Sequence, residues 1–399
     1  MIWYAVNRLR WVFLSTMVGL FAGFSASVFL FVLDRITALR EAYPQLIWGL
    51  PLGGLLSGYL YWRLGKNAAG GSTLIIEAVH DPEKVVPFRM APLILVGTVL
   101  THLFGGSAGR EGAAVQMSAS LSAQLSRWFH IRPEEKKILL MAGTGAGFGA
   151  TVGAPWAGFI FGLEVIRLRG GERFVAVLEC WVASFFAYSM TRFIHAPHLH
   201  LPKIALPEFQ LPTLLGVVVA GLCFGLVARA FVLCTHFIQN RLKLFPLFPP
   251  LGVAGMGMLL PVLYLWEGSL RYAGLGSSVI QQAFESKLSI VDPFYKLVFT
   301  ALTVGGGFKG GEFVPLVFMG ATLGNVLGQW LALPTSFVAA LGYVAVFGGA
   351  AKTPLACTCL AIELFGGSIG LYALIACGVS FWVAGDHGIY IAQKNDDLS

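Results

Sequence analysis

The sequence predicts an all-α, polytopic membrane protein built from two inverted-topology repeats with broken helices. Three observations predict this fold class. The chain of 399 residues is 56% hydrophobic and only 12% charged, whereas soluble domains carry about 25% charged residues. Uncharged apolar runs long enough to cross a bilayer recur along the chain. A pattern of Gly, Pro and Glu in the first half returns in the second half.

The apolar runs predict membrane-spanning helices. One run extends from Trp11 to Leu33 without a formal charge, and about 20 such residues suffice to cross the hydrocarbon layer. Shorter apolar pieces lie between the long runs. Because open sheet edges cannot face lipid, the spanning segments must be helical. We expect about ten full or broken spans in a single domain, residues 1–399.

The basic residues predict the orientation of the chain. The first apolar run is too long for a signal-peptide core and no small-residue cleavage site follows it, so it should remain as the first helix. Arg8 and Arg10 precede this run, and Arg167, Arg169 and Arg173 share a later loop. Because loops rich in Lys and Arg stay in the cytoplasm, we expect a cytoplasmic N-terminus. These loops explain the net charge of +7. A nucleic-acid-binding protein would need a basic face that bears aromatic residues, and because the sequence shows none, we do not expect this chain to bind nucleic acid.

Two pairs of segments in nearly the same register define the repeats. The segment around Pro155 reads GATVGAPWAGFIFGLEV, and the segment around Pro354 reads GGAAKTPLACTCLAIEL. In both, a Gly precedes the proline and a Glu follows it at the same spacing, so Glu164 and Glu363 match. The earlier pair reads GSAGREGAAVQMSASL and GGFKGGEFVPLVFMGATL. We predict repeat one over about residues 11–194, a connection over about 195–210 and repeat two over about 211–390.

Repeats of this kind build many secondary transporters. Their binding sites form at the repeat interface from helices that are interrupted by Gly and Pro. That composition occurs at residues 69–72, 105–112, 305–315 and 348–354. We therefore expect half-helices from both repeats to meet at a central site.

No pattern in the sequence indicates an enzyme, a metal site or a cofactor. The HExxH and P-loop patterns are absent. The glycines of segment 143–149 lack the spacing of a dinucleotide loop, so we expect them to allow close helix packing. The connection contains His195, His198 and His200, but without helical spacing or a carboxylate these histidines indicate a surface loop.

The first candidate site is the segment Gly109-Arg110-Glu111-Gly112, which opens a run of small and apolar residues. The flanking glycines let the chain break and start a helix, whose N-terminus presents unpaired N–H groups and the positive end of its dipole. Within a membrane this arrangement forms an anion site. The carboxylate of Glu111 can occupy that site and leave it when protonated, so that an anion and a proton exchange there.

Glu111 has an alternative interpretation as an ion pair with Arg110 at a helix end near water. A carboxylate inside a membrane costs a few kcal/mol, so an idle one is disfavoured. Neighbouring residues also point to different sides of a helix, which weakens such a pair. We expect Glu111 to be functional and Arg110 to bond nearby carbonyl groups.

Glu312 occupies the matching position in the second repeat, after Gly310 and Gly311 and before Pro315. Proline costs little in the first turn of a helix, so this segment is predicted to be a second half-helix directed at the site. Two glutamates that converge on one cavity would separate their proton affinities, with one held protonated. The alternative is an ion pair between Glu312 and Lys309.

These motifs resemble the CLC family of anion channels and anion/proton antiporters over nearly the whole chain. The matches are GREG at 109–112, GEFVP at 311–315, APWAG paired with TPLAC, and a late tyrosine, Tyr390. The resemblance implies a homodimer with one anion pathway per subunit, gating by Glu111, and Tyr390 at the inner end of the path. From the residues alone, Tyr390 is either an interfacial belt residue or a hydroxyl donor to an anion. The chain ends soon after it, so we expect no cytoplasmic regulatory domain.

Departures from the chloride-type pattern indicate a branch of that family. Gly71 stands where chloride-type members place a serine that helps to hold chloride, and Ala113 replaces the proline after the gating motif. Val165 follows Glu164 where chloride/proton exchangers carry a second glutamate, and Glu312 replaces an apolar residue. Together these features resemble the bacterial fluoride-exporting branch, which implies the inner (plasma) membrane of a bacterium.

The choice of anion stays open at this point. The fluoride branch typically reads GEVTP, but here Phe313 keeps the phenylalanine of the chloride pattern and Val314 takes the threonine position. The predicted function is exchange of a small halide, fluoride first, for protons. Chloride/proton antiport and a passive chloride channel are the alternatives. A cation or amino-acid transporter would use half-helix C-termini, and an intramembrane hydrolase would need a nucleophile–base pair.

The predicted site therefore takes residues from both repeats, and its predicted partners are a small anion, protons, the lipid bilayer and a second subunit. Glu111 and Glu312 are the predicted gating and proton-coupling residues. The predicted anion-binding residues are Gly71, Ser72, Gly109, Arg110, Gly112, Phe313, Val314 and Tyr390. Neither a cofactor nor a metal ion is expected.

Overall fold

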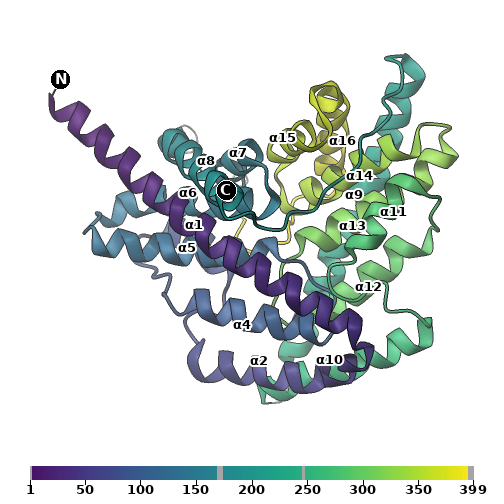
Figure 1. Ribbon diagram of the computed structural model, residues 1–399, viewed down its shortest axis with the longest axis horizontal. Helices are drawn as coiled ribbons and strands as arrows, with labels where there is room; N and C mark the ends of the chain where they lie inside the picture. The colour runs from purple at the N-terminus through teal and green to yellow at the C-terminus, as the bar shows by residue number, and fades with distance from the viewer. Residues whose placement is uncertain (1, 169–173, 245–247, 394–399) are drawn as a thin grey trace.

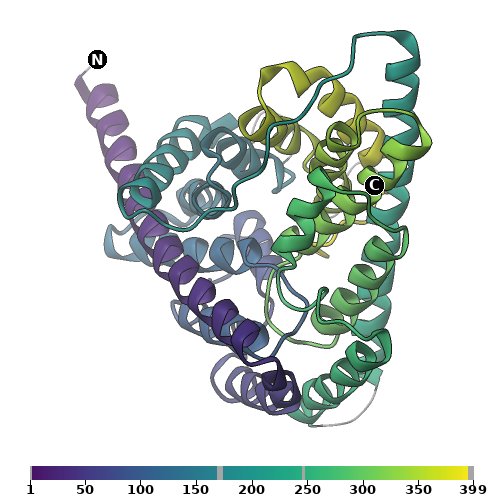
Figure 2. The same ribbon diagram turned by 45° about the vertical axis from the view of Figure 1, so that its right-hand side comes forward.

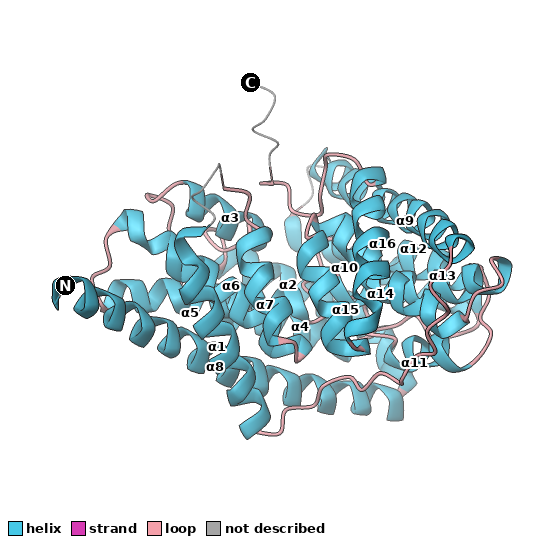
Figure 3. Cartoon of the chain, turned by 90° about the horizontal axis from the view of Figure 1, so that it is seen from above, coloured by secondary structure: helices cyan, strands magenta, loops and turns pink. Residues whose placement is uncertain are grey.

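The computed structural model describes residues 2–168, 174–244 and 248–393. Within these ranges the chain forms sixteen α-helices and a few short 3₁₀ helices, and Figure 3 shows helices joined by loops. Two members of the predicted basic loop, Arg169 and Arg173, lie outside the described residues. The prediction of an all-α fold is confirmed.

The helices of the first half recur in the same order in the second half. The first eight are α1 (Ile2–Ala42), α2 (Leu50–Leu64), α3 (Ser72–His80), α4 (Met90–Leu103), α5 (Glu111–Trp128), α6 (Lys136–Val152), α7 (Pro155–Glu164) and α8 (Val177–Phe193). The next eight are α9 (Leu211–Leu244), α10 (Pro249–Glu267), α11 (Ser277–Glu285), α12 (Val291–Gly305), α13 (Phe313–Trp330), α14 (Thr335–Ala351), α15 (Pro354–Phe365) and α16 (Gly370–Val383). The 3₁₀ helices include η1 (Pro44–Gly49), η2 (Pro133–Glu135) and η4 (Gly367–Ile369).

This order confirms the predicted two-repeat architecture. Long α1 corresponds to long α9, the helix that starts beside Glu111 corresponds to the one that starts beside Glu312, and each proline-initiated helix has its counterpart. Figures 1 and 2 show the first half, purple to blue, lying beside the second half, green to yellow. The halves meet along several pairs of helices, including α2 with α10 and α7 with α15.

The helices include full and broken spans, as predicted. Five described segments are long and apolar enough to cross a membrane: Arg8–Ala42, Phe174–Phe193, Leu211–Leu244, Pro249–Glu267 and Phe313–Trp330. Shorter apolar helices accompany them, such as Met90–Leu103 and Pro354–Phe365. A short helix cannot cross about 30 Å of hydrocarbon alone. The helices that start at Glu111 and Phe313 begin at buried residues, so their first N–H groups are available to a site inside the protein.

Glycines on α6 allow its neighbours to approach closely. A Cβ atom on Gly145 would lie 2.5 Å from the carbonyl oxygen of Gly158 on α7, and one on Gly147 would lie 2.8 Å from Cβ of Ser118 on α5. Both separations are shorter than a normal contact, so only glycine permits this spacing. The expectation of close helix packing in this segment is confirmed. Small residues at the interface of membrane helices let their backbones approach closely.

Each repeat caps a helix of the other repeat. The carboxylate of Glu363 on α15 accepts the N–H groups of Trp156 (3.0 Å) and Ala157 (2.8 Å) at the start of α7. The carboxylate of Glu164 on α7 accepts the N–H groups of Leu355 (3.0 Å) and Ala356 (2.7 Å) at the start of α15. Neither helix has a cap from its own N-cap side chain. Because a carboxylate is favoured at the positive end of a helix dipole, these two matched glutamates join the repeats.

The connection between the repeats is a loop without regular structure, residues 196–210. It runs across the face of the molecule from α8 to α9 (Figure 3). The expectation of a surface loop holds for most of it. His198 differs, because its ring is partly buried and its Nε2 lies 2.8 Å from the carbonyl oxygen of Ala150. This contact holds the loop against the end of α6.

Candidate functional site

The two predicted half-helices start side by side because their preceding glycines pair. The N–H of Gly109 donates to the carbonyl of Gly311 (2.6 Å), and the N–H of Gly311 donates to the carbonyl of Gly109 (2.8 Å). A Cβ atom on Gly311 would lie 2.6 Å from the backbone nitrogen of Gly112, so a side chain has no room there. This bridge places the N-termini of α5 and α13 together at the centre of the repeat interface.

Glu111 is the first residue of α5 and is almost fully buried, with 4% of its side chain exposed. Its Oε2 accepts the N–H of Arg110 (3.2 Å), and its Oε1 lies 3.4 Å from Nε of Arg110. The expectation that these neighbours point apart was wrong. Arg110 is the N-cap and lies outside the regular helix, so its side chain can turn toward the first residue of the helix. The carboxylate therefore occupies the helix N-terminus together with a guanidinium partner.

The carboxylate of Glu111 faces a small cavity of about 170 Å³. Phe313 and Val314, the first residues of α13, line the same cavity, together with Tyr343 of α14 and His198 of the connection. Phe313 and Val314 are buried, so α13 presents an apolar first turn to Glu111. Residues of both repeats and of the connection therefore surround the carboxylate of Glu111.

Burial disfavours a positive charge on His198 where it lines this cavity. Burial is the main cause that lowers its pKa, and the nearby positive charge of Arg110 lowers it further. Since a carbonyl oxygen only accepts, the contact with Ala150 assigns the ring proton to Nε2. A neutral imidazole adds no charge to the wall around Glu111.

Glu312 is the N-cap of α13 and lines a different and larger cavity of about 690 Å³. A Cβ atom on Gly112 would lie 3.6 Å from Glu312 Oε2, so this carboxylate lies beside the first turn of α5. The expectation that both glutamates converge on one cavity was wrong. They lie near the same pair of helix starts but open onto two cavities, because residues 111 and 312 occupy different positions relative to the Gly109–Gly311 bridge.

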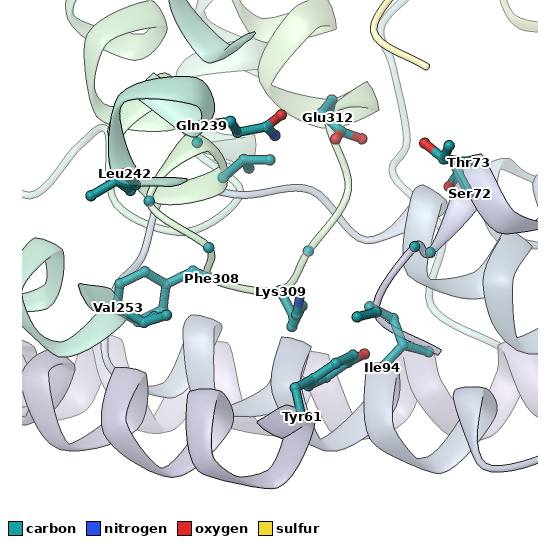
Figure 4. Close-up of a pocket in the computed structure, with 18 of the residues that line it drawn as sticks. Tyr61, Ser72, Thr73, Ile94, Gln239, Leu242, Val253, Phe308, Lys309 and Glu312 are labelled. Atoms are coloured by element: carbon teal, nitrogen blue, oxygen red, sulfur yellow. The ribbon is translucent and has the colours of Figure 1, made fainter. Parts of the chain in front are cut away.

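The alternative pairing of Glu312 with Lys309 does not occur in the described part of the chain. Lys309 instead places its ammonium 4.2 Å from the centre of the Tyr61 ring on α2. Figure 4 shows the two side chains leaving the same loop in different directions, with Lys309 toward Tyr61. The carboxylate of Glu312 is therefore not neutralised by this lysine in a contact pair.

Gly71, Ser72 and Tyr390 also line the larger cavity. Gly71 has a φ of 53° and ends the loop before α3, and a Cβ there would lie 3.2 Å from Gln116 Oε1 on α5. Gln116 Nε2 donates to Ser72 Oγ (3.3 Å), which leaves the serine hydroxyl proton free to donate into the cavity. Tyr390 lines this cavity, as a place along an anion path requires, and its role as a hydroxyl donor to an anion stays a prediction.

The comparisons with known proteins agree with this geometry. The family model for voltage-gated chloride channels matches residues 53–385, which includes both half-helices and most of both repeats. This match decides the family. The chain is a member of the CLC family.

Two relatives show where the chain stands among CLC proteins. It is 42% identical to a "Chloride/fluoride channel protein" of Pseudomonas syringae pv. tomato, over 96% of this chain and 86% of that protein. It is 26% identical to an "H(+)/Cl(-) exchange transporter ClcA" of Yersinia pestis, over 83% of this chain and 74% of that protein.

Two solved structures give the same fold. The crystal structure of a CLC-type fluoride/proton antiporter superposes with a TM-score of 0.93 at 34% identity, and 98% of each chain is covered. A slow cyanobacterial Cl⁻/H⁺ antiporter superposes with a TM-score of 0.83 at 22% identity, and 96% of each chain is covered. The similarity to the cyanobacterial antiporter supports the fold alone.

This CLC site also contains residues that sequence reasoning missed. The rings of Phe148 and Phe347 pack edge to face against Phe313, at 5.3 Å and 4.7 Å between centroids, and Tyr343 lies at 6.3 Å. They form an aromatic wall next to the Glu111 cavity. Phe148, Phe347 and Tyr343 sit inside continuous apolar helices, where no change of pattern marks a site residue. Gln116 is the residue of this group that the sequence could have indicated, because it is a polar amide within the run of small residues in α5.

Proposed function

We propose that this CLC chain is a secondary active transporter, not an enzyme, which exchanges a small halide, fluoride first, for protons. The observation that carries the proposal is the placement of two glutamates at facing helix N-termini, each open to a separate cavity. Helix N-termini bind anions, and a carboxylate inside a membrane is costly unless it has a task. The printed descriptions of the relatives, chloride/fluoride channel and fluoride/proton antiporter, support the same choice.

The proposed mechanism uses the competition between the Glu111 carboxylate and a halide for the N-terminus of α5. While ionised, the carboxylate accepts the backbone N–H of Arg110 and keeps the halide out. When it binds a proton it becomes neutral, leaves the N–H groups and is replaced by the halide. The proton thus travels with the side chain while the halide travels past it, and the two fluxes are coupled in opposite directions.

Glu312 has a second role in this mechanism, on the side of the larger cavity. Val165 occupies the position of the inner glutamate of chloride/proton exchangers, and its carbonyl accepts a hydrogen bond from Gln393. No carboxylate is therefore available at that position. Glu312 lines the larger cavity and lies beside the start of α5, so it can exchange protons between that cavity and the centre of the protein.

Fluoride is the preferred halide in this proposal because it is small and strongly hydrated. It needs close donors, and the hydroxyl of a protonated Glu312 is one. Gly71 removes the serine that holds the larger chloride ion in chloride-type members. Val314 has no hydroxyl, which favours a weaker preference than in relatives with threonine. Chloride handling is thus the second candidate.

The setting of the transporter is part of the same proposal. We place the chain in the inner membrane of a bacterium with a cytoplasmic N-terminus, as the basic residues before α1 suggest. We further propose a homodimer with one complete pathway per subunit, since both glutamates and both cavities belong to a single chain.

The test is halide efflux from proteoliposomes with the external pH recorded. We expect an outward fluoride gradient to drive proton uptake, with fluoride efflux faster than chloride efflux from matched vesicles. Halide efflux without proton movement would make the protein a passive channel. A fluoride-to-chloride ratio at or below one would overturn the fluoride assignment and leave a chloride-handling member.

A further inference from the structure

The larger cavity carries more positive than negative side chains. Among the described residues that line it, the charged ones are Lys243, Lys309 and Glu312. Lys243 lies at the exposed C-terminal end of α9, whereas Lys309 is only partly exposed and belongs to the loop between α12 and α13. If Glu312 takes up a proton during transport, the cavity holds two cations and no anion. Its walls then attract a negative ion.

Lys309 is held in a defined place in this cavity. Its ammonium lies 4.2 Å from the centre of the Tyr61 ring, and Figure 4 shows the two side chains close together below the loop. Gly97 of α4 makes room for the stem of the lysine, because a Cβ there would lie 2.8 Å from Lys309 Cγ. The side chain is therefore positioned by two helices of the first repeat, although it belongs to the second.

The ring contact alone does not account for a charge at this depth. A cation–π contact stabilises an ammonium only modestly, and charged side chains inside membrane proteins usually pair with an opposite charge or face a water-filled cavity. Lys309 makes no ion pair with a carboxylate in the described ranges, and its nearest acidic neighbour along the loop, Glu312, is directed elsewhere (Figure 4). An ion from the cavity is the remaining partner of opposite charge.

We propose that Lys309 and the Tyr61 ring form a second halide site in the larger cavity, which loads the anion before it reaches Glu312. The ammonium supplies the charge, and the ring holds the ammonium in place. The hydroxyl of Ser72 lines the same cavity, so a partly hydrated halide finds further donors on its way. This inference rests on the proposed function, because a loading site has meaning only if the anion crosses the cavity.

The test measures initial halide flux against halide concentration in proteoliposomes for Lys309→Met, which keeps the stem and removes the charge. We expect the half-saturating fluoride concentration to rise about tenfold, which equals about 1.4 kcal/mol, with the fluoride-to-proton ratio unchanged. Lys309→Arg keeps the charge and should stay within about threefold of the wild type. Lys243→Met is the matched control at the exposed mouth, where solvent screens the charge, and should change the value less than about twofold.

A second variant moves the lysine without removing it. Gly97→Ala adds a methyl group against Lys309 Cγ and displaces the stem, so it should also raise the half-saturating concentration. This variant keeps the assay informative if Lys309→Met folds poorly. An unchanged concentration in Lys309→Met or, where that variant fails to fold, in Gly97→Ala overturns the site. An equal rise in the half-saturating concentration for Lys243→Met would also overturn the site, because any positive charge near the cavity would then have the same effect.

The two proposals fail in different ways. A wild-type protein that moves no protons against a fluoride gradient refutes the proposed antiport, whatever the lysine variants do. A wild type with coupled transport and a Lys309→Met variant with unaltered half-saturation refutes only the loading site.

Discussion

The reciprocal caps between the repeats offer a stability test whose size follows from the structure. Glu363→Gln removes the negative charge from the start of α7 and leaves one carbonyl oxygen for two N–H donors, those of Trp156 (3.0 Å) and Ala157 (2.8 Å). A hydrogen bond to a charged group contributes about 1.5–3 kcal/mol when it is buried. Here the carboxylate is partly exposed and the amide keeps one bond. We therefore expect a loss of about 1–3 kcal/mol in the free energy of unfolding.

The assay is thermal unfolding of the purified protein in detergent, read as the fraction that stays monodisperse after heating. At about 2 cal/mol/K of unfolding entropy per residue, the expected loss lowers the midpoint by roughly 1–4 °C. Glu164→Gln should produce the same shift, because its bonds to Leu355 and Ala356 have matching lengths. The double variant should lose nearly the sum, since the two carboxylates share no partner.

The control is Glu285→Gln, which changes an exposed glutamate at the end of α11 and should leave the midpoint within about 1 °C. If Glu363→Gln and Glu164→Gln behave like this control, the caps do not stabilise the joint between the repeats. A large effect of one variant with none of the other would contradict the matched roles that we assign to the two glutamates.

The remaining predictions concern transport and pH. Glu111→Gln should abolish halide-driven proton movement, because an amide does not titrate; wild-type proton pumping by this variant would remove Glu111 from the mechanism. Glu312→Gln should also impair coupled flux, and a variant unchanged in both fluxes would show that Glu312 has no role in coupling. Val314→Thr should raise the fluoride-to-chloride efflux ratio, since it adds a hydroxyl at a buried position of nearly equal volume; a constant ratio would contradict a role for this position. His198 has a lowered pKa in the fold, so the unfolded chain binds more protons and stability should fall as pH drops below about 6.5. His198→Gln keeps a donor for Ala150 and should flatten that part of the melting-temperature profile; an equal slope in both proteins would refute this linkage.

Much of this protein could be predicted from the order of its residues because the membrane restricts the chain. Long apolar runs in a bilayer must be helical, so these runs predict the all-α class. The glutamates that follow Gly109 and Gly311 mark the half-helices, since a charge is unusual within an apolar segment. The repeated spacing of Glu164 and Glu363 likewise gave their equivalence before any contact was known.

The tertiary structure decided which residues meet. The Gly109–Gly311 bridge determines that Glu111 and Glu312 face different cavities, a relation that depends on three-dimensional direction and not on spacing along the chain. The pairing of Arg110 with Glu111 depends on the irregular backbone at an N-cap, where helical periodicity does not apply.

Contacts between the repeats are the part that sequence patterns cannot supply. Glu363 caps α7 and Lys309 packs on Tyr61 across more than half of the chain. Phe148 and Phe347 reach the site from apolar helices whose composition is the same on every side. In a bilayer, apolar residues are favoured both against lipid and inside the protein, so hydrophobicity does not tell the two environments apart. Only the packing of the helices determines which apolar side chain lines the path.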